Sequence, residues 1–233
     1  MQQPDHHEPP EQMVNPLPPV VAALFLVLLG IEVVFYLGAR GIIGGPGAIG
    51  WRLDAIQRFA FSPEILNFMI DTGRWQSENV IRVFSYVFIH AGFTHALFVG
   101  VFLLAMGKMV AEVFGGLAML TIFFASACVG ALAYGLLAPD GPVLIGGFPA
   151  VYGLIGGFTY ILWLSLSTVG ANQSRAFSLI AVLMGLQLLF GLLFGGAPDW
   201  IADLSGFATG FLLSFVLSPG GWTKLLEKMR DRE

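Results

Sequence analysis

The chain has 233 residues, of which 56% are hydrophobic and only 11% charged, and its formal net charge at pH 7 is −4. An ordinary soluble domain carries about a quarter charged residues. This composition therefore excludes a water-exposed globular domain and predicts a chain surrounded by a lipid bilayer. The negative charge gives no indication of a nucleic-acid partner, and none is expected.

The two ends of the chain differ in composition from the rest. Residues 1–15 are polar, acidic and proline-rich, which predicts a disordered tail without the basic start of a cleavable signal peptide. Residues 219–233 predict a short cytoplasmic helix or tail. The residues between them, 16–218, are expected to form one transmembrane domain.

Six apolar runs are long enough, alone or with their neighbours, to cross ~30 Å of hydrocarbon as helices. Because backbone polar groups in lipid must be satisfied within each segment, the runs predict a packed helix bundle. The expected fold class is an all-α membrane protein with six transmembrane helices. The runs are 20–37, 95–109, 117–137, 149–166, 177–194 and 201–217, of which the second and fourth are short.

The segment 38–82, after the first run, is too polar to cross a membrane and too long for a simple turn. It contains two amphipathic pieces, 56–61 and 65–70, together with Trp51 and Trp75. Aromatic residues with scattered arginines suit the headgroup layer of a bilayer. This first loop is therefore predicted to be half-immersed.

The distribution of lysine and arginine predicts the orientation. If six spans alternate, Lys108, Arg175 and the basic residues of the C-terminal segment fall on one side. The short loops on the other side hold only the acidic Asp140 and Asp199. Both termini are therefore expected in the cytoplasm, and a short chain without a signal peptide suits a bacterial inner membrane.

Two polar residues fall inside the predicted spans. Glu32 lies about a turn from the boundary of the first span, so we expect it to be hydrated or to reach toward the headgroups. Gln187 in the fifth span is expected to bond to another helix. With so few ionisable groups at mid-membrane, a transporter or an ion pathway is disfavoured.

A glycine-rich stretch, IGGFPAVYGLIG at 145–156, opens the fourth predicted helix. It resembles the Gly-x-Ser-Gly stretch that opens the fourth membrane helix of rhomboid intramembrane serine proteases. Where that family has its nucleophilic serine this chain has Phe148, and Pro149 replaces the following glycine. Proline fits the first helical turn because its missing N–H would have no partner there.

The resemblance continues through a pair of histidines and covers about residues 82–210. His90 and His95 keep the spacing of two family histidines, but Val99 stands where the family has an asparagine. In active members the second histidine and the asparagine stabilise the oxyanion. Losing one such donor costs about 10²–10³ in rate.

The general base of the family is changed as well, because Asp203 stands where helix six carries a histidine. Tyr152 keeps the aromatic residue that stacks on that histidine. A serine protease needs a nucleophile, a base and oxyanion donors. The resemblance implies that all three are altered, at Phe148, Asp203 and Val99, so no intact set of catalytic residues is expected.

Other matches are structural. The resemblance implies that small residues in helix six let it approach helix four, where glycines offer a matching seam. An arginine before the second helix and a glycine before the fourth also match. These retained positions are Arg82, Gly146, Gly153, Gly157, Gly206 and Gly210.

A carboxylate inside a membrane helix is costly and needs a partner or a function. One hypothesis is that Asp203 accepts hydrogen bonds from His95, Tyr152 or both. The other is that it lies near the outer end of its helix and is hydrated. A metal site from His90, His95 and Asp203 is not expected, because the five-residue histidine spacing does not place both on one helical face. No cofactor is expected.

The resemblance implies a rhomboid pseudoprotease, similar to derlins and inactive animal rhomboids. Such a protein binds transmembrane clients or joins a membrane protein complex without cleaving its partners, in quality control, trafficking or complex assembly. The alternative is a divergent rhomboid-family intramembrane serine endopeptidase with an unrecognised nucleophile, Ser205 or Thr94. Ser205 occupies a glycine position of the helix seam, where a small packing residue is the simpler explanation.

Overall fold

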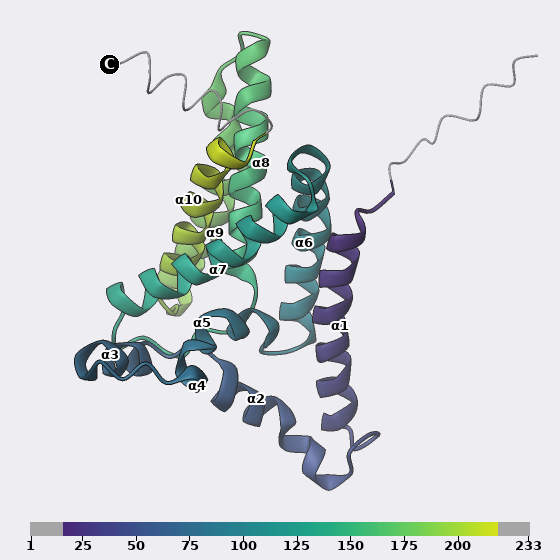
Figure 1. The fold of residues 1–233 in the computed structure, drawn as a ribbon, viewed down its shortest axis with the longest axis vertical. Coiled ribbons are helices and arrows are strands. Elements are labelled where there is room, and N and C mark those ends of the chain that lie inside the picture. Colours follow the sequence, from purple (N-terminus) through teal and green to yellow (C-terminus); the bar gives the residue numbers. More distant parts are fainter. Residues whose placement is uncertain (1–15, 219–233) are drawn as a thin grey trace, which may run out of the picture.

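The computed structural model describes residues 16–218, so the predicted N-terminal tail and C-terminal segment lie outside the described residues. The described chain is all-helical, with six helices long and apolar enough to cross a membrane (Figure 1). Residues 16–218 contain no β-strand, and one isolated bridge joins Phe61 to Leu144. The predicted fold class is confirmed.

The six long helices follow the six apolar runs, and each begins and ends within a few residues of its run. The predicted short second and fourth spans are full-length helices, because polar residues at their ends continue the helical backbone past the apolar stretch. The helices are α1 (Pro19–Ala39), α6 (Phe93–Phe114), α7 (Gly116–Leu137), α8 (Phe148–Thr168), α9 (Ser178–Phe194) and α10 (Trp200–Leu217).

Helix α8 is the centre of the bundle. It is the most buried span, because 56% of its most apolar 18-residue stretch lies inside the protein. Helices α6, α7 and α10 all pack against it. The span Gln173–Phe194, which contains α9, is the most exposed, with only 11% of its most apolar 18-residue stretch buried. In lipid an apolar helix needs no cover from water, so α9 lies at the edge of the bundle with little protein packing.

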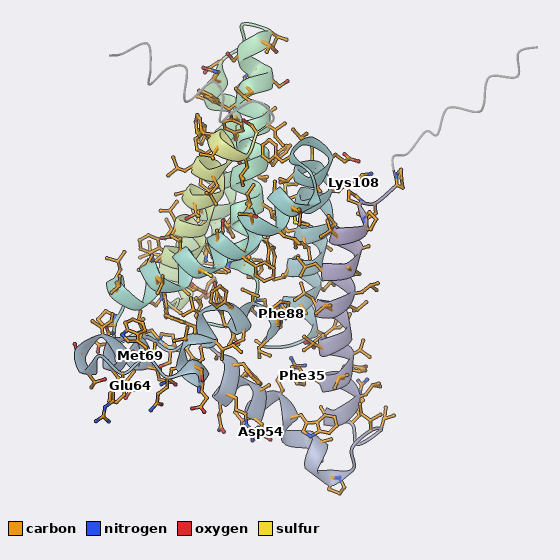
Figure 2. The ribbon with its side chains drawn as sticks, viewed as in Figure 1. Phe35, Asp54, Glu64, Met69, Phe88 and Lys108 are labelled. Carbon is orange, nitrogen blue, oxygen red and sulfur yellow. The ribbon has the colours of Figure 1, made fainter. Side chains whose placement is uncertain are left out.

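The first loop folds into short helices that gather at one end of the bundle (Figure 1). Asp54 and Glu64 lie at this end, and Lys108 lies at the opposite end (Figure 2). Helix α1 begins, and α10 ends, at the Lys108 end (Figure 1). The loop helices are η1 (Pro46–Gly50), α2 (Trp51–Phe59), α3 (Pro63–Thr72), α4 (Ser77–Val80), α5 (Arg82–Ser85) and η2 (Tyr86–Phe88), and a further short helix, η3 (Gln173–Phe177), precedes α9.

Glycines set the distance between α8 and α10. A Cβ atom at Gly206 would overlap the carbonyl oxygen of Pro149, and one at Gly210 would overlap the carbonyl oxygen of Gly153. The sequence pattern did not single out Gly156, yet a Cβ there would overlap the carbonyl oxygen of Phe207. Backbone therefore meets backbone along this seam, which only glycine allows.

Candidate functional site

A cavity of about 420 Å³ opens at the end of the bundle where α10 begins. Helix α6 contributes His95 to its wall, α9 contributes Gln187, and α10 with the residue before it contributes two carboxylates. The aromatic wall comes from α6 and α8. The side chains on which its chemistry depends are His95, Phe148, Tyr152, Gln187, Asp199 and Asp203.

The segment before α8 is held in place by backbone hydrogen bonds. Leu144 and Phe61 exchange two bonds, of 2.8 and 3.1 Å, and the N–H of Gly146 donates to the carbonyl of Tyr86 at 3.0 Å. Gly146 has a φ of +94°, and a Cβ there would overlap the imidazole of His95. Both the backbone conformation and the approach of His95 therefore require glycine at this position.

Phe148 begins α8 and lies against His95. The two rings are stacked, with centroids 5.1 Å apart and planes 17° apart. On its other side His95 meets His90 edge to face, with centroids 5.2 Å apart. The structure thus brings the two histidines of the sequence motif and the aromatic residue in the nucleophile slot into one group of three rings.

The two histidines have few hydrogen bonds. The Nδ1 atom of His95 accepts a long bond of 3.4 Å from the N–H of Ala91. The Nε2 atoms of His90 and His95 are buried and have no hydrogen-bond partner within the described chain. Val99, at the family's asparagine position, is fully buried, and a Cβ on Gly147 would lie 2.8 Å from its Cγ1. It offers an apolar contact and no donor there.

Asp203 lies in the first turn of α10 and is 4% exposed. Its Oδ2 accepts a hydrogen bond of 2.8 Å from the Nε2 of Gln187. The hydroxyl of Tyr152 donates to the Oε1 of the same glutamine at 3.4 Å. The prediction that Gln187 bonds to another helix is confirmed, and it links α9 to both α8 and α10.

This arrangement differs from the first hypothesis for Asp203, because within residues 16–218 it has no direct hydrogen bond to His95 or to Tyr152. Asp203 does lie near the start of its helix, as the second hypothesis expected, but it is buried there. The link to Tyr152 passes through Gln187 instead. The reason is geometric, because the aromatic stack turns His95 toward Phe148 and the long amide side chain spans the gap between α9 and α10.

An ion pair that was not predicted from the sequence lies next to the backbone of His90. Arg52 of α2 makes two hydrogen bonds, of 2.7 and 2.9 Å, to the carboxylate of Glu32 in α1. It also donates to the carbonyl oxygen of His90 at 2.6 Å. Glu32 is 2% exposed, so the prediction of a hydrated or snorkelling carboxylate is wrong. The sequence did contain a signal for this pair, because a carboxylate inside a span needs a cationic partner and the first loop is rich in arginine.

Two groups near the cavity but outside the spans have shifted pKa values. Burial, followed by the charges of His95 and Arg52, lowers the pKa of His90 to about 4, so its imidazole is neutral at pH 7. Burial raises the pKa of Asp199, while hydrogen bonds, including one from Gln187, oppose the rise.

Arg82 holds the first loop against the bundle. Its guanidinium donates to the carbonyl oxygens of Ala60 at 3.0 Å and Gln57 at 2.8 Å. Gln57 lies in the last turn of α2 and Ala60 directly follows that helix. The two hydrogen bonds therefore join the C-terminal end of α2 to the start of α5. Arg82 therefore lies away from the cavity and organises the backbone.

The residues considered as replacement nucleophiles lie in different places. Thr94 lines the cavity next to His95, whereas Ser205 does not line it. Within residues 16–218 neither hydroxyl is hydrogen-bonded to a histidine or a carboxylate. No group of three or more metal-binding side chains occurs in the part of the chain that the structure describes.

The fold and the site define an integral, multi-pass membrane protein whose helices converge on a buried polar centre. The family model described as the Rhomboid domain matches residues 77–220, which is more than half of the chain. The chain therefore belongs to the rhomboid family.

Several relatives are similar over the same region. The chain is 25% identical over 150 residues to the rhomboid-named protein YdcA of Bacillus subtilis (strain 168), which covers 64% of this chain and 71% of that one. It is 31% identical over 139 residues to RHOMBOID-like protein 4 of Arabidopsis thaliana, covering 58% and 34%. It is 29% identical over 157 residues to Rhomboid-like protease 3 of Toxoplasma gondii, covering 66% and 54%. The chain thus spans about a third to a half of the last two relatives.

Proposed function

We propose that this rhomboid-family membrane protein is a pseudoprotease that binds transmembrane segments of client proteins without cleaving them. The observation that carries the proposal is the stack of Phe148 on His95. By the family resemblance Phe148 takes the place of the nucleophile, and a phenyl ring has neither a proton to lose nor a lone pair to attack with. Its ring stacks on the imidazole of His95, and both rings line the cavity.

The base position supports the same conclusion. Asp203 is turned to Gln187 by a 2.8 Å hydrogen bond, and no hydroxyl of residues 16–218 donates to it. A nucleophile within reach of a base is the geometric requirement for acyl transfer. Among the described residues no hydroxyl is hydrogen-bonded to His95 or Asp203, although the cavity beside them is present.

The bundle also offers a route for a client helix. A second hollow of about 620 Å³ lies between α9 and the segment 195–200, and it shares Gln187 and Asp199 with the first cavity. Little of the protein packs against α9, since only 11% of the most apolar stretch of its span, Gln173–Phe194, is buried. Apart from the hydrogen bonds of Gln187, displacing α9 breaks few protein contacts, so a transmembrane segment of another protein can take its place at modest cost.

One observation favours the alternative, a divergent serine endopeptidase. Thr94 lines the cavity and neighbours His95, so a hydroxyl and an imidazole are both present. A threonine nucleophile would need the imidazole to turn away from Phe148 and accept its proton. That movement breaks the aromatic stack, and the pseudoprotease therefore remains the better-supported function.

A labelling experiment separates the two functions. The purified full-length protein in bicelles is treated with a fluorophosphonate probe, and a fluorogenic transmembrane peptide reports cleavage. We expect neither labelling nor cleavage, while a photoreactive amino acid at position 98, in the cavity wall, crosslinks to the added peptide. Labelling that disappears in Thr94→Val or Ser205→Ala would establish the endopeptidase and refute the pseudoprotease.

The proposal includes the setting of the protein. Residues 16–218 form the client-binding transmembrane domain, and both termini lie in the cytoplasm of a bacterium with the protein in its inner membrane. The single lysine of the described spans, Lys108, lies at the end where α1 begins and α10 ends (Figure 2), so it is on the cytoplasmic side in this orientation. Reporter fusions at each loop test it: a periplasm-dependent reporter should be active after Asp140 and inactive after Ala171.

A further inference from the structure

The cavity contains two carboxylates without a cation to balance them. Asp203 is 4% exposed, whereas Asp199, which lines the same space four residues earlier, is exposed and precedes α10. Within residues 16–218 no arginine or lysine is paired with either of them. A carboxylate at membrane depth is normally paired with a positive charge or a proton relay.

The hydrogen bonds in the cavity do not supply that charge. Gln187 donates its amide to Asp203 at 2.8 Å, but an amide is neutral and stabilises an anion only by its dipole. The proton of Tyr152 points to the Oε1 of Gln187 and not to a carboxylate. Among the described residues Asp203 therefore has a neutral hydrogen-bond donor and no cationic partner.

The shape of the cavity suits a long cationic side chain. Its wall is mostly apolar and includes Phe98 and Phe148 as well as the two carboxylates. A lysine or arginine buries its aliphatic stem on apolar surface and keeps its charged head among polar groups. The adjoining hollow along α9 shares Asp199 and Gln187 with the cavity, so a side chain can enter from the side where a client helix would lie.

Resting on the proposed function, we infer that the cavity selects client transmembrane segments that carry a lysine or arginine near the membrane boundary. The cationic head lies between Asp199 and Asp203, and the stem lies against Phe148. Selection follows because a buried cation in a lipid-exposed helix is costly, and the paired carboxylates remove that cost only for a client that presents one.

Binding of two matched peptides tests the inference. One is a synthetic leucine-alanine transmembrane peptide with a single lysine about five residues from each end, so that either orientation presents one. Its twin has methionine at both positions. Full-length protein is reconstituted in phosphatidylcholine vesicles, and energy transfer between labels on protein and peptide gives the affinity. The lysine peptide should bind at least about tenfold more tightly.

Variants of the two carboxylates test whether Asp199 and Asp203 cause the preference for the lysine peptide. Asp203→Asn and Asp199→Asn should each lower the ratio of the affinity for the lysine peptide to the affinity for the methionine twin toward one. Asp140→Asn, an exposed loop residue outside the cavity, should keep the full preference. Thermal unfolding followed by circular dichroism shows separately whether each variant is folded.

The remaining outcomes are equally decisive. Equal binding of both peptides to the native protein would refute the inference and leave client binding intact. No binding of either peptide would refute the proposed function itself. If the lysine preference vanishes when phosphatidylethanolamine is added to the vesicles, the cavity binds the lipid ammonium group and the assignment to a protein client is wrong.

Discussion

The imidazole of His95 stacks on the ring of Phe148 with 5.1 Å between centroids and 17° between planes. The contact joins α6 to the first residue of α8, at the wall of the cavity. An imidazole and a phenyl ring in this offset, nearly parallel arrangement attract each other beyond the area they bury. The stack therefore both fills the centre and fixes the rotamer of His95.

A double-mutant cycle measures this stack. We expect Phe148→Ala and His95→Ala to show a coupling free energy of about 0.5–1.5 kcal/mol, the range for aromatic pairs. Unfolding in bicelles by steric trapping gives the four free energies. Phe98 lines the same cavity, and within the described residues it makes no aromatic ring pair with His95 or Phe148. Phe98→Ala should therefore couple to His95→Ala less strongly than Phe148→Ala does; coupling as large as that of Phe148 would argue against a specific stack.

The buried ion pair should dominate the stability of the first loop. Removing one partner by Glu32→Gln or Arg52→Met leaves the other charge without its counter-ion. We expect a loss of roughly 2–4 kcal/mol, below the largest values for buried pairs because Arg52 is 22% exposed. The double variant Glu32→Met with Arg52→Met should recover part of the loss.

The exposed pair of α6 provides the control for this prediction. Lys108 and Glu112 are four residues apart, 3.8 Å from each other and about a third exposed. Glu112→Gln should change the free energy of unfolding by no more than about 0.5 kcal/mol. Equal losses for Glu112→Gln and Glu32→Gln would show that Glu32 is not the buried anchor that its geometry indicates.

The glycine seam predicts a contrast between two substitutions of the same kind. Gly210→Ala places a Cβ on the carbonyl oxygen of Gly153, and backbone cannot move aside cheaply. We expect a loss of about 1–3 kcal/mol or more. Gly185→Ala in α9, where no atom lies within 4 Å of the new Cβ, should be neutral or slightly stabilising. Similar losses at both sites would contradict the close approach of α8 and α10.

Stability should depend on pH through His90. Its folded pKa of about 4 lies below the ordinary 6.5, so the unfolded chain binds a proton in this range and the folded chain does not. The contribution is fully present above pH 6.5 and is lost as the pH falls from about 6.5 toward about 4. His90→Leu should flatten the stability profile in that window.

The opposite slope of Asp199 has to be removed to isolate this effect. Because burial raises its pKa, its contribution falls as the pH rises. The comparison is therefore made in an Asp199→Asn background. Nitrogen NMR of labelled histidine gives a direct measurement, and an imidazole of His90 that titrates near 6.5 in the folded protein would refute the prediction.

The sequence by itself determined the number of spans, their approximate bounds and the start of α8. These features are local, because hydropathy over about 20 residues decides whether a segment enters lipid, and a proline with glycines before it decides where a helix begins. Family membership could also be predicted, since it depends on residue order and spacing, and the match to residues 77–220 confirmed it.

Only the tertiary structure decided which polar groups pair. Glu32 and Arg52 are 20 residues apart, and Gln187 and Asp203 are 16 apart, with a turn or loop between each pair. Whether such side chains meet depends on how each helix is rotated about its own axis. Packing at the glycine seam and the aromatic stack set that rotation, and a single sequence carries no local signal for it.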